Sequence, residues 1–154
     1  MAKKKVARKK TGKSPGATAR TVARRPKAPR PPLAAVRGAE RRSVGGVRLE
    51  VGRAGEARVK RLVYPPGFHW AVDMKPIVGT DLCMHAHAGF LVQGEFHTRY
   101  ADGCLVKHKA PQIISLEPGH DGWVVGAEPV VMIEFDFEAD TVRRLGMPQG
   151  HLHK

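Results

Sequence analysis

Residues 114–137 read ISLEPGHDGWVVGAEPVVMIEFDF, a series of short apolar runs separated by Pro-Gly-His-Asp-Gly and by Gly-Ala-Glu-Pro. Runs of this length between Gly, Pro and Asp are typical of β-strands joined by turns. The last run alternates with a period of two, which predicts one strand face in the core and the other in water. The two sets are Val131, Ile133, Phe135 and Phe137, and Met132, Glu134, Asp136 and Glu138.

The same pattern begins at Val47, with turn residues at regular intervals, and it predicts an all-β sandwich or barrel. Asp102-Gly103 is a strong hairpin signal. Asp140–Leu145 is predicted to form one helical turn with Asp140 as a possible cap. The predicted strands are Val47–Val51, Ala57–Tyr64, Phe68–Val72, His87–Gln93, Phe96–Tyr100, Cys104–His108, Ile113–Leu116, Trp123–Val125 and Val130–Phe137.

The 154 residues divide by charge into a basic tail and a nearly neutral body. Residues 1–32 carry 12 of the 27 Lys and Arg residues and none of the 14 Asp and Glu residues, which leaves 15 against 14 for the rest. A body of this size forms one domain. We therefore expect a tail at 1–32, a linker at 33–44, a barrel at 45–138, and a short turn and tail at 139–154.

The tail is predicted to be disordered, because its Lys, Arg, Ala, Thr, Pro and Gly residues cannot bury enough apolar surface to offset the ordering entropy. Its charge suits non-specific binding of DNA or RNA, since each phosphate contact releases counterions. The bland alternative is a solubilising extension. The predicted nucleic-acid contacts are Lys3, Lys4, Lys5, Arg8, Lys9, Lys10, Lys13, Arg24 and Arg25.

Several other classes are disfavoured. No run approaches the length of a membrane helix and the N-terminus lacks the apolar core of a secretory signal, so we expect a soluble, cytoplasmic protein without a membrane partner. Cys83 and Cys104 are too few for a disulfide scaffold and are expected to be reduced. The chain has no phosphate loop and no dinucleotide fingerprint, which argues against ATP or NAD chemistry.

Six of the eight histidines lie between His69 and His120. His85 and His87 are two residues apart, so on an extended strand their rings share a face and could bind one metal ion. His120, in a turn, could supply a third imidazole. The alternative is that these rings only form hydrogen bonds in a polar barrel mouth, for instance with Asp121 or Glu95.

Two segments, GTDLCMHAHAGFLVQGEF at residues 79–96 and ISLEPGHDGWVVGAEPVVMIEF at 114–135, resemble the two motif regions of a small cupin. They are similar to uncharacterised single-domain cupins reading roughly GTDSC…H.GYVLSG…PPGHDAWVVGDEP. The resemblance spans about residues 57–137 and implies a double-stranded β-helix, the RmlC-like jelly-roll barrel. In cupins, two histidines, a glutamate and a later histidine bind one divalent metal ion.

The first cupin motif fits the chain in two registers. Counted from Gly79, His85 and His87 match the two histidines, and Leu91 or Val92 stands in the glutamate position. The interval to the closing glycine of the motif is then too short, so the first metal-ligand strand is shortened or remodelled.

Counted back from Gly94 instead, His87 takes the glutamate position and Cys83 a histidine position, where Cys83 would be a soft third ligand. In the second motif, His120 stands two positions early and Gly122 occupies the expected histidine position. The resemblance thus implies the fold, with an incomplete set of the usual ligands.

We expect a cupin-domain protein that binds a small molecule in a pocket at the barrel mouth. The predicted ligand-binding residues are Trp70, His87, His120, Asp121 and Trp123, and the predicted metal ligands are His85, His87 and His120, for Fe, Mn, Ni or Zn. Trp70 and Trp123 could instead be ordinary core. Whether the protein is an enzyme stays open. One alternative is a metal-dependent dioxygenase or isomerase, another a nucleic-acid-associated protein tethered by its tail, and a homodimer is plausible.

Overall fold

The computed structural model of the chain describes residues 36–152. This part consists of nine β-strands, two short helices between β3 and β4, and a helical turn after β9. The strands are β1 (Glu40–Val44), β2 (Val47–Ala54), β3 (Ala57–Tyr64), β4 (His87–Gln93), β5 (Glu95–Tyr100), β6 (Leu105–Lys109), β7 (Gln112–Leu116), β8 (His120–Val125) and β9 (Val130–Asp136). The helices are α1 (Trp70–Asp73), α2 (Lys75–Val78), the 3-10 helix η1 (Glu138–Asp140) and α3 (Thr141–Leu145).

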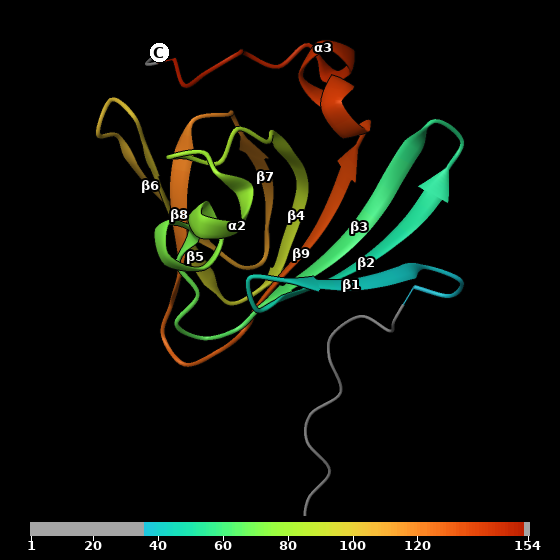
Figure 1. The fold of residues 1–154 in the computed structure, drawn as a ribbon, viewed down its shortest axis with the longest axis horizontal. Coiled ribbons are helices and arrows are strands. Elements are labelled where there is room, and N and C mark those ends of the chain that lie inside the picture. The colour runs from blue at the N-terminus through green and yellow to red at the C-terminus, as the bar shows by residue number, and fades with distance from the viewer. Residues whose placement is uncertain (1–35, 153–154) are drawn as a thin grey trace, which may run out of the picture. The chain divides into compact units, whose positions relative to one another are not determined.

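The strands form two antiparallel sheets that face each other across the core (Figure 1). The first has the order β1-β2-β3-β9-β4-β7 and the second has the order β6-β5-β8. Several strands that are neighbours in a sheet are distant in the sequence, such as β3 beside β9 and β5 beside β8. This is the arrangement of a jelly roll built from Greek keys. The all-β jelly-roll prediction is therefore confirmed.

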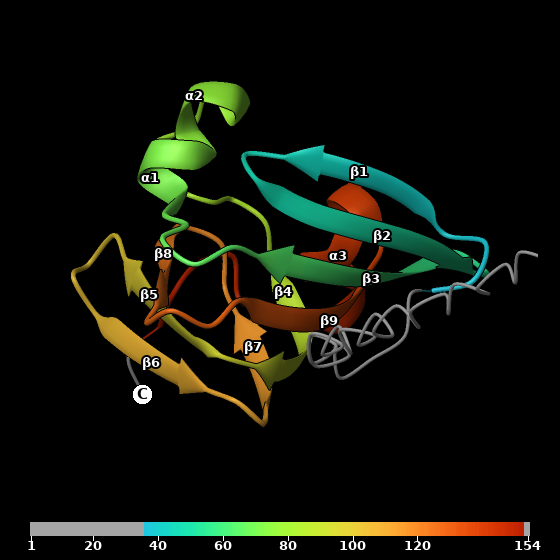
Figure 2. The ribbon, with the colours of Figure 1, turned by 90° about the horizontal axis from the view of Figure 1, so that it is seen from below.

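The sequence predicts a strand at Phe68–Val72, between β3 and β4, and this prediction is wrong. Only His69 pairs with the small sheet, in an isolated bridge to Trp123, and the chain then turns into α1 and α2. The Asp73 carboxylate accepts a hydrogen bond from the backbone N–H of His69 at 2.8 Å, which favours the helical turn over an extended strand. Figure 2 shows both helices at the end of the barrel where the β1–β2 turn lies.

β1 lies within residues 33–44, where the sequence predicts a linker, so this part of the prediction is wrong. The strand pairs with β2 through a two-residue turn at Gly45 and Gly46, both with positive φ (53° and 76°). Such a turn matches the twist of a hairpin. At Gly45 a side chain is also excluded, because a Cβ atom would lie 2.7 Å from the carbonyl oxygen of Asp73.

β9 shows the predicted alternation, but its buried face is the acidic one. Met132, Glu134 and Asp136 are each 1% exposed, whereas Phe135 on the opposite face is 41% exposed. The prediction of one core face and one solvent face is confirmed, and the core face is the one that carries Glu134 and Asp136. The carboxylates are buried because β3 and β4 bring cationic groups to them, as described below.

The core lies between the two sheets. Its buried members are Val47, Leu62, Tyr64, Phe68, Leu91, Phe96, Ile114, Val124, Val130 and Met132. After β9, α3 confirms the helical turn predicted at Asp140–Leu145, and Gly146 ends it with a left-handed φ of 62°. Asp140 makes no side-chain cap and binds Arg143 instead. Within residues 36–152, no helix has the length and apolar character needed to span a membrane.

Candidate metal centre

Cys83, His87 and His120 meet at one end of the barrel, and their potential ligand atoms all lie within 4.8 Å of one another. Cys83 belongs to the loop before β4, His87 is the first residue of β4, and His120 is the first residue of β8. The loop is held to β8 because the N–H of Cys83 donates to the carbonyl of His120 at 2.8 Å, and the N–H of Gly119 donates to the carbonyl of Cys83 at 2.8 Å. The backbone thus fixes the positions from which the three side chains converge.

Both imidazoles are oriented by their Nδ1 atoms. His87 Nδ1 lies 2.8 Å from Oε1 of Glu134, and His120 Nδ1 lies 2.6 Å from the carbonyl oxygen of Glu117. Since these oxygens accept hydrogen bonds, each Nδ1 carries a proton and each Nε2 faces inward; His87 Nε2 is 3.5 Å from Cys83 Sγ. A carboxylate or carbonyl behind the ligating imidazole is the usual support of a metal-binding histidine. The donor set and its support therefore fit a metal ion.

Cys83, His87 and Glu134 form a row of charged side chains. Burial raises the pKa of Cys83, but hydrogen bonds with His120 and His87 lower it to about 6 overall. Burial lowers the pKa of His87, yet the charges of Glu134 and Cys83 raise it to about 10. Burial likewise raises the pKa of Glu134, and His87 and Lys60 bring it down to about 2. At neutral pH the row is therefore thiolate, imidazolium and carboxylate.

A second group of buried charges lies behind this row. Lys60 Nζ is 2.9 Å from Glu134 Oε2 and 2.7 Å from Asp136 Oδ2, and the Lys60 side chain is 8% exposed. Arg58 binds Asp136 through two hydrogen bonds, of 2.7 and 2.8 Å. Although burial lowers the pKa of Lys60, the two carboxylates raise it above its usual value. Two cations from β3 thus balance two carboxylates from β9.

His85, a predicted metal ligand, belongs to this second group. Its Nε2 lies 3.1 Å from Asp136 Oδ2 and 3.3 Å from Lys60 Nζ. Burial and the positive charges of His87 and Lys60 lower the pKa of His85 to about 4, which leaves it neutral at pH 7. The structure groups Cys83, and not His85, with His87 and His120.

The predicted ligand-binding residues fall on two sides of the barrel wall. Trp70, His87 and His120 line the cavity. Asp121 and Trp123 do not, because β8 alternates: His120 and Gly122 face the cavity, and their neighbours face outward. Asp121 Oδ2 lies 2.7 Å from His69 Nε2, and the Trp123 ring contacts the rings of His69 and His97.

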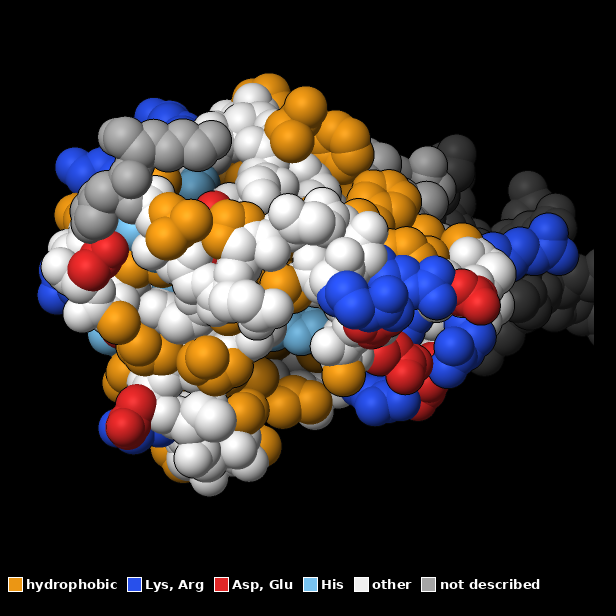
Figure 3. Space-filling model, turned by 90° about the horizontal axis from the view of Figure 1, so that it is seen from above, with side chains coloured by type: hydrophobic (Ala, Val, Ile, Leu, Met, Phe, Trp, Pro, Cys, Tyr) orange, Lys and Arg blue, Asp and Glu red, His pale blue; other side chains and the backbone are white. Residues whose placement is uncertain are grey.

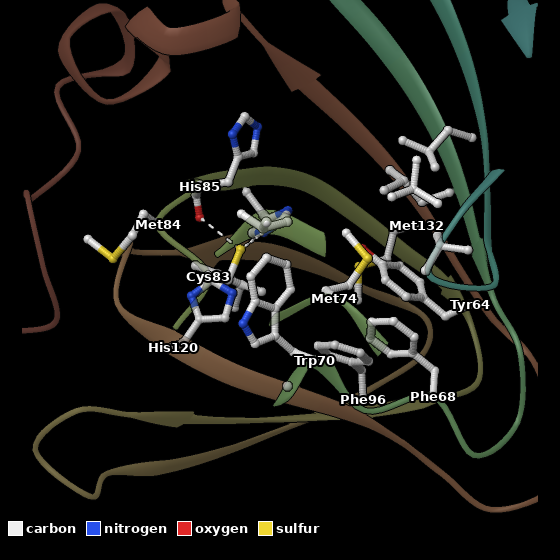
Figure 4. A pocket seen from close by; sticks show the side chains of 18 of the residues that line it. Tyr64, Phe68, Trp70, Met74, Cys83, Met84, His85, Phe96, His120 and Met132 are labelled. Atoms are coloured by element: carbon white, nitrogen blue, oxygen red, sulfur yellow. Dashed lines mark hydrogen bonds between the residues drawn. The ribbon is translucent and has the colours of Figure 1, made fainter. Parts of the chain in front are cut away.

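A cavity of about 500 Å³ opens beside the three residues, and Figure 4 shows it from close by. Its volume suits a small organic molecule. Most of its wall is apolar. α1 contributes Trp70, α2 contributes Val78, and Met74 between the two helices also lines the cavity. The strands add Val44, Val47, Leu49, Lys60, Leu62, Tyr64, His87, Phe96, Leu116, His120, Gly122 and Met132, and the loops add Phe68, Thr80, Cys83, Met84 and His85.

The arrangement of the sheets identifies the architecture. One sheet contains β3-β9-β4-β7 in the order of a jelly roll, and the other contains β8-β5-β6. The position beside β8 is reduced to two isolated bridges, His69 with Trp123 and Cys83 with His120. The polar centre lies inside the barrel, as the cupin resemblance implies. The chain has the cupin jelly-roll fold.

Comparisons with known proteins find similar solved structures but no matching family. No family model and no curated protein matches the chain. It is similar to the structure of a cupin 2 conserved barrel domain protein from Salinispora arenicola, with 15% identity, a TM-score of 0.49, and coverage of 74% of this chain and 94% of that one. It is also similar to the cupin domain of Schizosaccharomyces pombe Cnp3, with 11% identity, a TM-score of 0.46, and coverage of 72% and 77%. A cupin-like protein from Thermotoga maritima is 12% identical, with a TM-score of 0.43 and coverage of 62% and 71%.

Sequence reasoning did not assign Glu134, Glu117 and Lys60 to the site. Lys60 and Glu134 each share a strand face with buried apolar residues, Leu62 and Tyr64 for Lys60 and Val130 and Met132 for Glu134, and a charge beside such positions is a readable signal. The carbonyl of Glu117 has no such signal. Cys83 was reached only through one of the two motif registers.

The predicted nucleic-acid contacts between Lys3 and Arg25 lie outside the described residues, so binding of DNA or RNA stays a prediction. On the face drawn in Figure 3, one group of Lys and Arg side chains of the body lies together with Asp and Glu side chains. Ion pairs of this kind include Arg53 with Glu138 and Arg144 with Glu56. Deleting residues 2–32 and measuring retention on DNA at physiological salt tests the tail.

Proposed function

We propose that the barrel binds one divalent metal ion through Cys83 Sγ, His87 Nε2 and His120 Nε2, and binds a small molecule in the adjoining cavity. The observation that carries this proposal is the support of both imidazoles through Nδ1, which leaves the Nε2 atoms available to a metal ion. His87 Nε2 lies 3.5 Å from the Cys83 sulfur, and the ligand atoms of all three residues lie within 4.8 Å of one another. Three protein ligands leave a coordination position for water or a small molecule, as in catalytic zinc sites. The metal would act there as a Lewis acid.

Among the metals considered, zinc suits this centre best. One thiolate and two imidazoles form a borderline-soft donor set, whereas manganese prefers oxygen ligands. The 3.5 Å between Cys83 Sγ and His87 Nε2 is close to the separation of two ligand atoms on one tetrahedral zinc ion, about 3.5 Å for bonds of about 2.0 and 2.3 Å. Iron remains the next choice.

A titration with Co²⁺ and Zn²⁺ tests the proposal. We expect one Co²⁺ per chain, with the intense near-ultraviolet absorption of a cobalt–thiolate bond, and displacement of cobalt by one equivalent of Zn²⁺. The variant Cys83→Ser should lose this absorption. Cys104→Ser is the matched control, because the sulfur of Cys104 is not part of the cluster. Absence of stoichiometric binding, or thiolate absorption that persists in Cys83→Ser, contradicts the proposal.

Metal binding is expected to release protons. Between about pH 6 and pH 10 the metal-free centre holds a Cys83 thiolate and a His87 imidazolium, so a metal ion must displace one proton from His87 Nε2. The affinity for Zn²⁺ should therefore rise about tenfold per pH unit from pH 6.5 to 8.5, and fall more steeply below pH 6, where Cys83 also takes up a proton. Calorimetry in buffers of different ionisation enthalpy measures the proton count; an affinity independent of pH contradicts the charge assignment.

A further inference from the structure

The cavity wall contains a buried donor that has no hydrogen-bond partner in the described part of the chain and that the metal proposal does not use. Nε1 of Trp70 is buried, and no hydrogen-bond partner for it occurs among residues 36–152. A buried N–H without a partner is costly, and the great majority of buried donors are paired. Trp70 is therefore a candidate for contact with a bound molecule.

Trp70 is held in place by the residues around it. The Asp121 carboxylate accepts hydrogen bonds from the backbone N–H of Ala71 and binds His69, and Asp73 accepts from the N–H of His69. These contacts anchor the start of α1 to β8. In Figure 4 the indole lies between the Cys83 and His120 side chains and the rings of Phe68 and Phe96, with its nitrogen on the side of His120.

Thr80, Lys60 and His85, which are polar residues of the same wall, have partners of their own. Thr80 Oγ1 donates to the carbonyl of Leu82, and Lys60 and His85 are engaged with Asp136. Away from the metal centre, the wall is formed by apolar and aromatic side chains such as Phe68, Phe96 and Met132. The cavity thus offers the Trp70 N–H next to the centre and a mostly apolar space beyond it, in which the Tyr64 hydroxyl is a further polar group.

We propose that the cavity binds a small monocarboxylate with an apolar body, whose head group accepts a hydrogen bond from Trp70 Nε1. A carboxylate has two oxygens, one for the indole N–H and one for the open position of the metal. A divalent ion with a single thiolate ligand keeps a net positive charge, which favours an anionic head group. The apolar body fills the space between the aromatic rings. This inference rests on the proposed function only for the contact between the second carboxylate oxygen and the metal ion.

Octanoate is a suitable probe, and octylammonium, with the same chain and no acceptor, is its control. By calorimetry, we expect zinc-loaded protein to bind octanoate and to bind octylammonium at least about tenfold more weakly. Trp70→Phe, which keeps an aromatic ring and removes the N–H, should weaken octanoate binding about tenfold or more. The matched control is Trp123→Phe, because Trp123 lies outside the cavity. Equal affinity in Trp70→Phe and the unaltered chain overturns the proposal, as does equal binding of the two probes.

Indole N–H resonances provide a second measurement that does not depend on the stability of a variant. The chain has only two tryptophans, so its ¹⁵N spectrum contains two indole signals. Octanoate should shift the Trp70 signal and leave the Trp123 signal in place, in metal-free as well as zinc-loaded protein. A shift without any cobalt or zinc binding would leave the Trp70 contact standing and refute only the metal centre; an unmoved Trp70 signal refutes the contact.

Discussion

Replacing His87 by alanine is expected to lower the affinity for Zn²⁺ about 100- to 1000-fold. The estimate follows from the apparent binding free energy of about 10–16 kcal/mol in four-ligand zinc sites, divided among the ligands. His87 is also the residue that connects Cys83 to Glu134, with contacts of 3.5 and 2.8 Å. Its loss therefore removes both a ligand and the link to the buried carboxylate. Competition with a chromophoric chelator measures the affinity.

A graded series separates direct ligation from support. Glu134→Gln keeps the shape of the side chain behind His87 and should weaken Zn²⁺ binding about 10- to 100-fold. His97→Ala is the control, because His97 lies on the outer face of the small sheet and binds Glu95. If His97→Ala weakens binding as much as His87→Ala, zinc is bound elsewhere and the assignment is wrong.

Replacing Lys60 by methionine is expected to lower the free energy of unfolding by about 3–5 kcal/mol, the usual cost of removing one partner from a buried ion pair. Lys60 lies within 2.9 Å of both Glu134 and Asp136, each only 1% exposed. Methionine retains most of the apolar stem, so the lost charge dominates. Arg58 and His87 continue to bind the two carboxylates, but neither replaces the shared ammonium group.

Urea denaturation of the Lys60→Met variant measures this effect. Lys107→Met is the matched control, because Lys107 is exposed on β6 and should change the unfolding free energy by less than about 0.5 kcal/mol. Adding Asp136→Asn to Lys60→Met should recover part of the loss, since it removes one of the two carboxylates that have lost the shared ammonium group. If Lys60→Met alone is as stable as the unaltered chain, Lys60 is not required to balance these charges.

Strands and turns were the most predictable part of the fold, because their signals are local. The hairpin at Asp102-Gly103 is present, and there Gly103 has a φ of 86° and the Asp102 carboxylate accepts from the N–H of Cys104. The segment after Phe68 is less predictable, because its run of apolar residues also fits a strand. Its helical turn is stabilised by a hydrogen bond that the Asp73 carboxylate accepts from the N–H of His69. Such competition between local patterns is decided by the surrounding structure.

The candidate site was predictable only in part. His87, His120 and Trp70 were identified from spacing and resemblance, and they do line one cavity. Asp121 and Trp123 were grouped with them by proximity in sequence, although adjacent residues of a strand point to opposite sides. The metal identity, a homodimer, any catalytic activity and a cytoplasmic location stay predictions.

By itself, the sequence determined that this chain alternates short strands with turns and that its histidines fall into the two segments of a jelly roll, because both properties depend on neighbours within a few residues. Only the tertiary structure decided that Cys83, and not His85, lies together with His87 and His120 and that β9 buries its carboxylates. The His87–Glu134 pair joins residues 47 apart, and the Lys60–Glu134 pair joins β3 to β9. The burial of a charge depends on which opposite charge the strand register places beside it, and no local pattern specifies that partner.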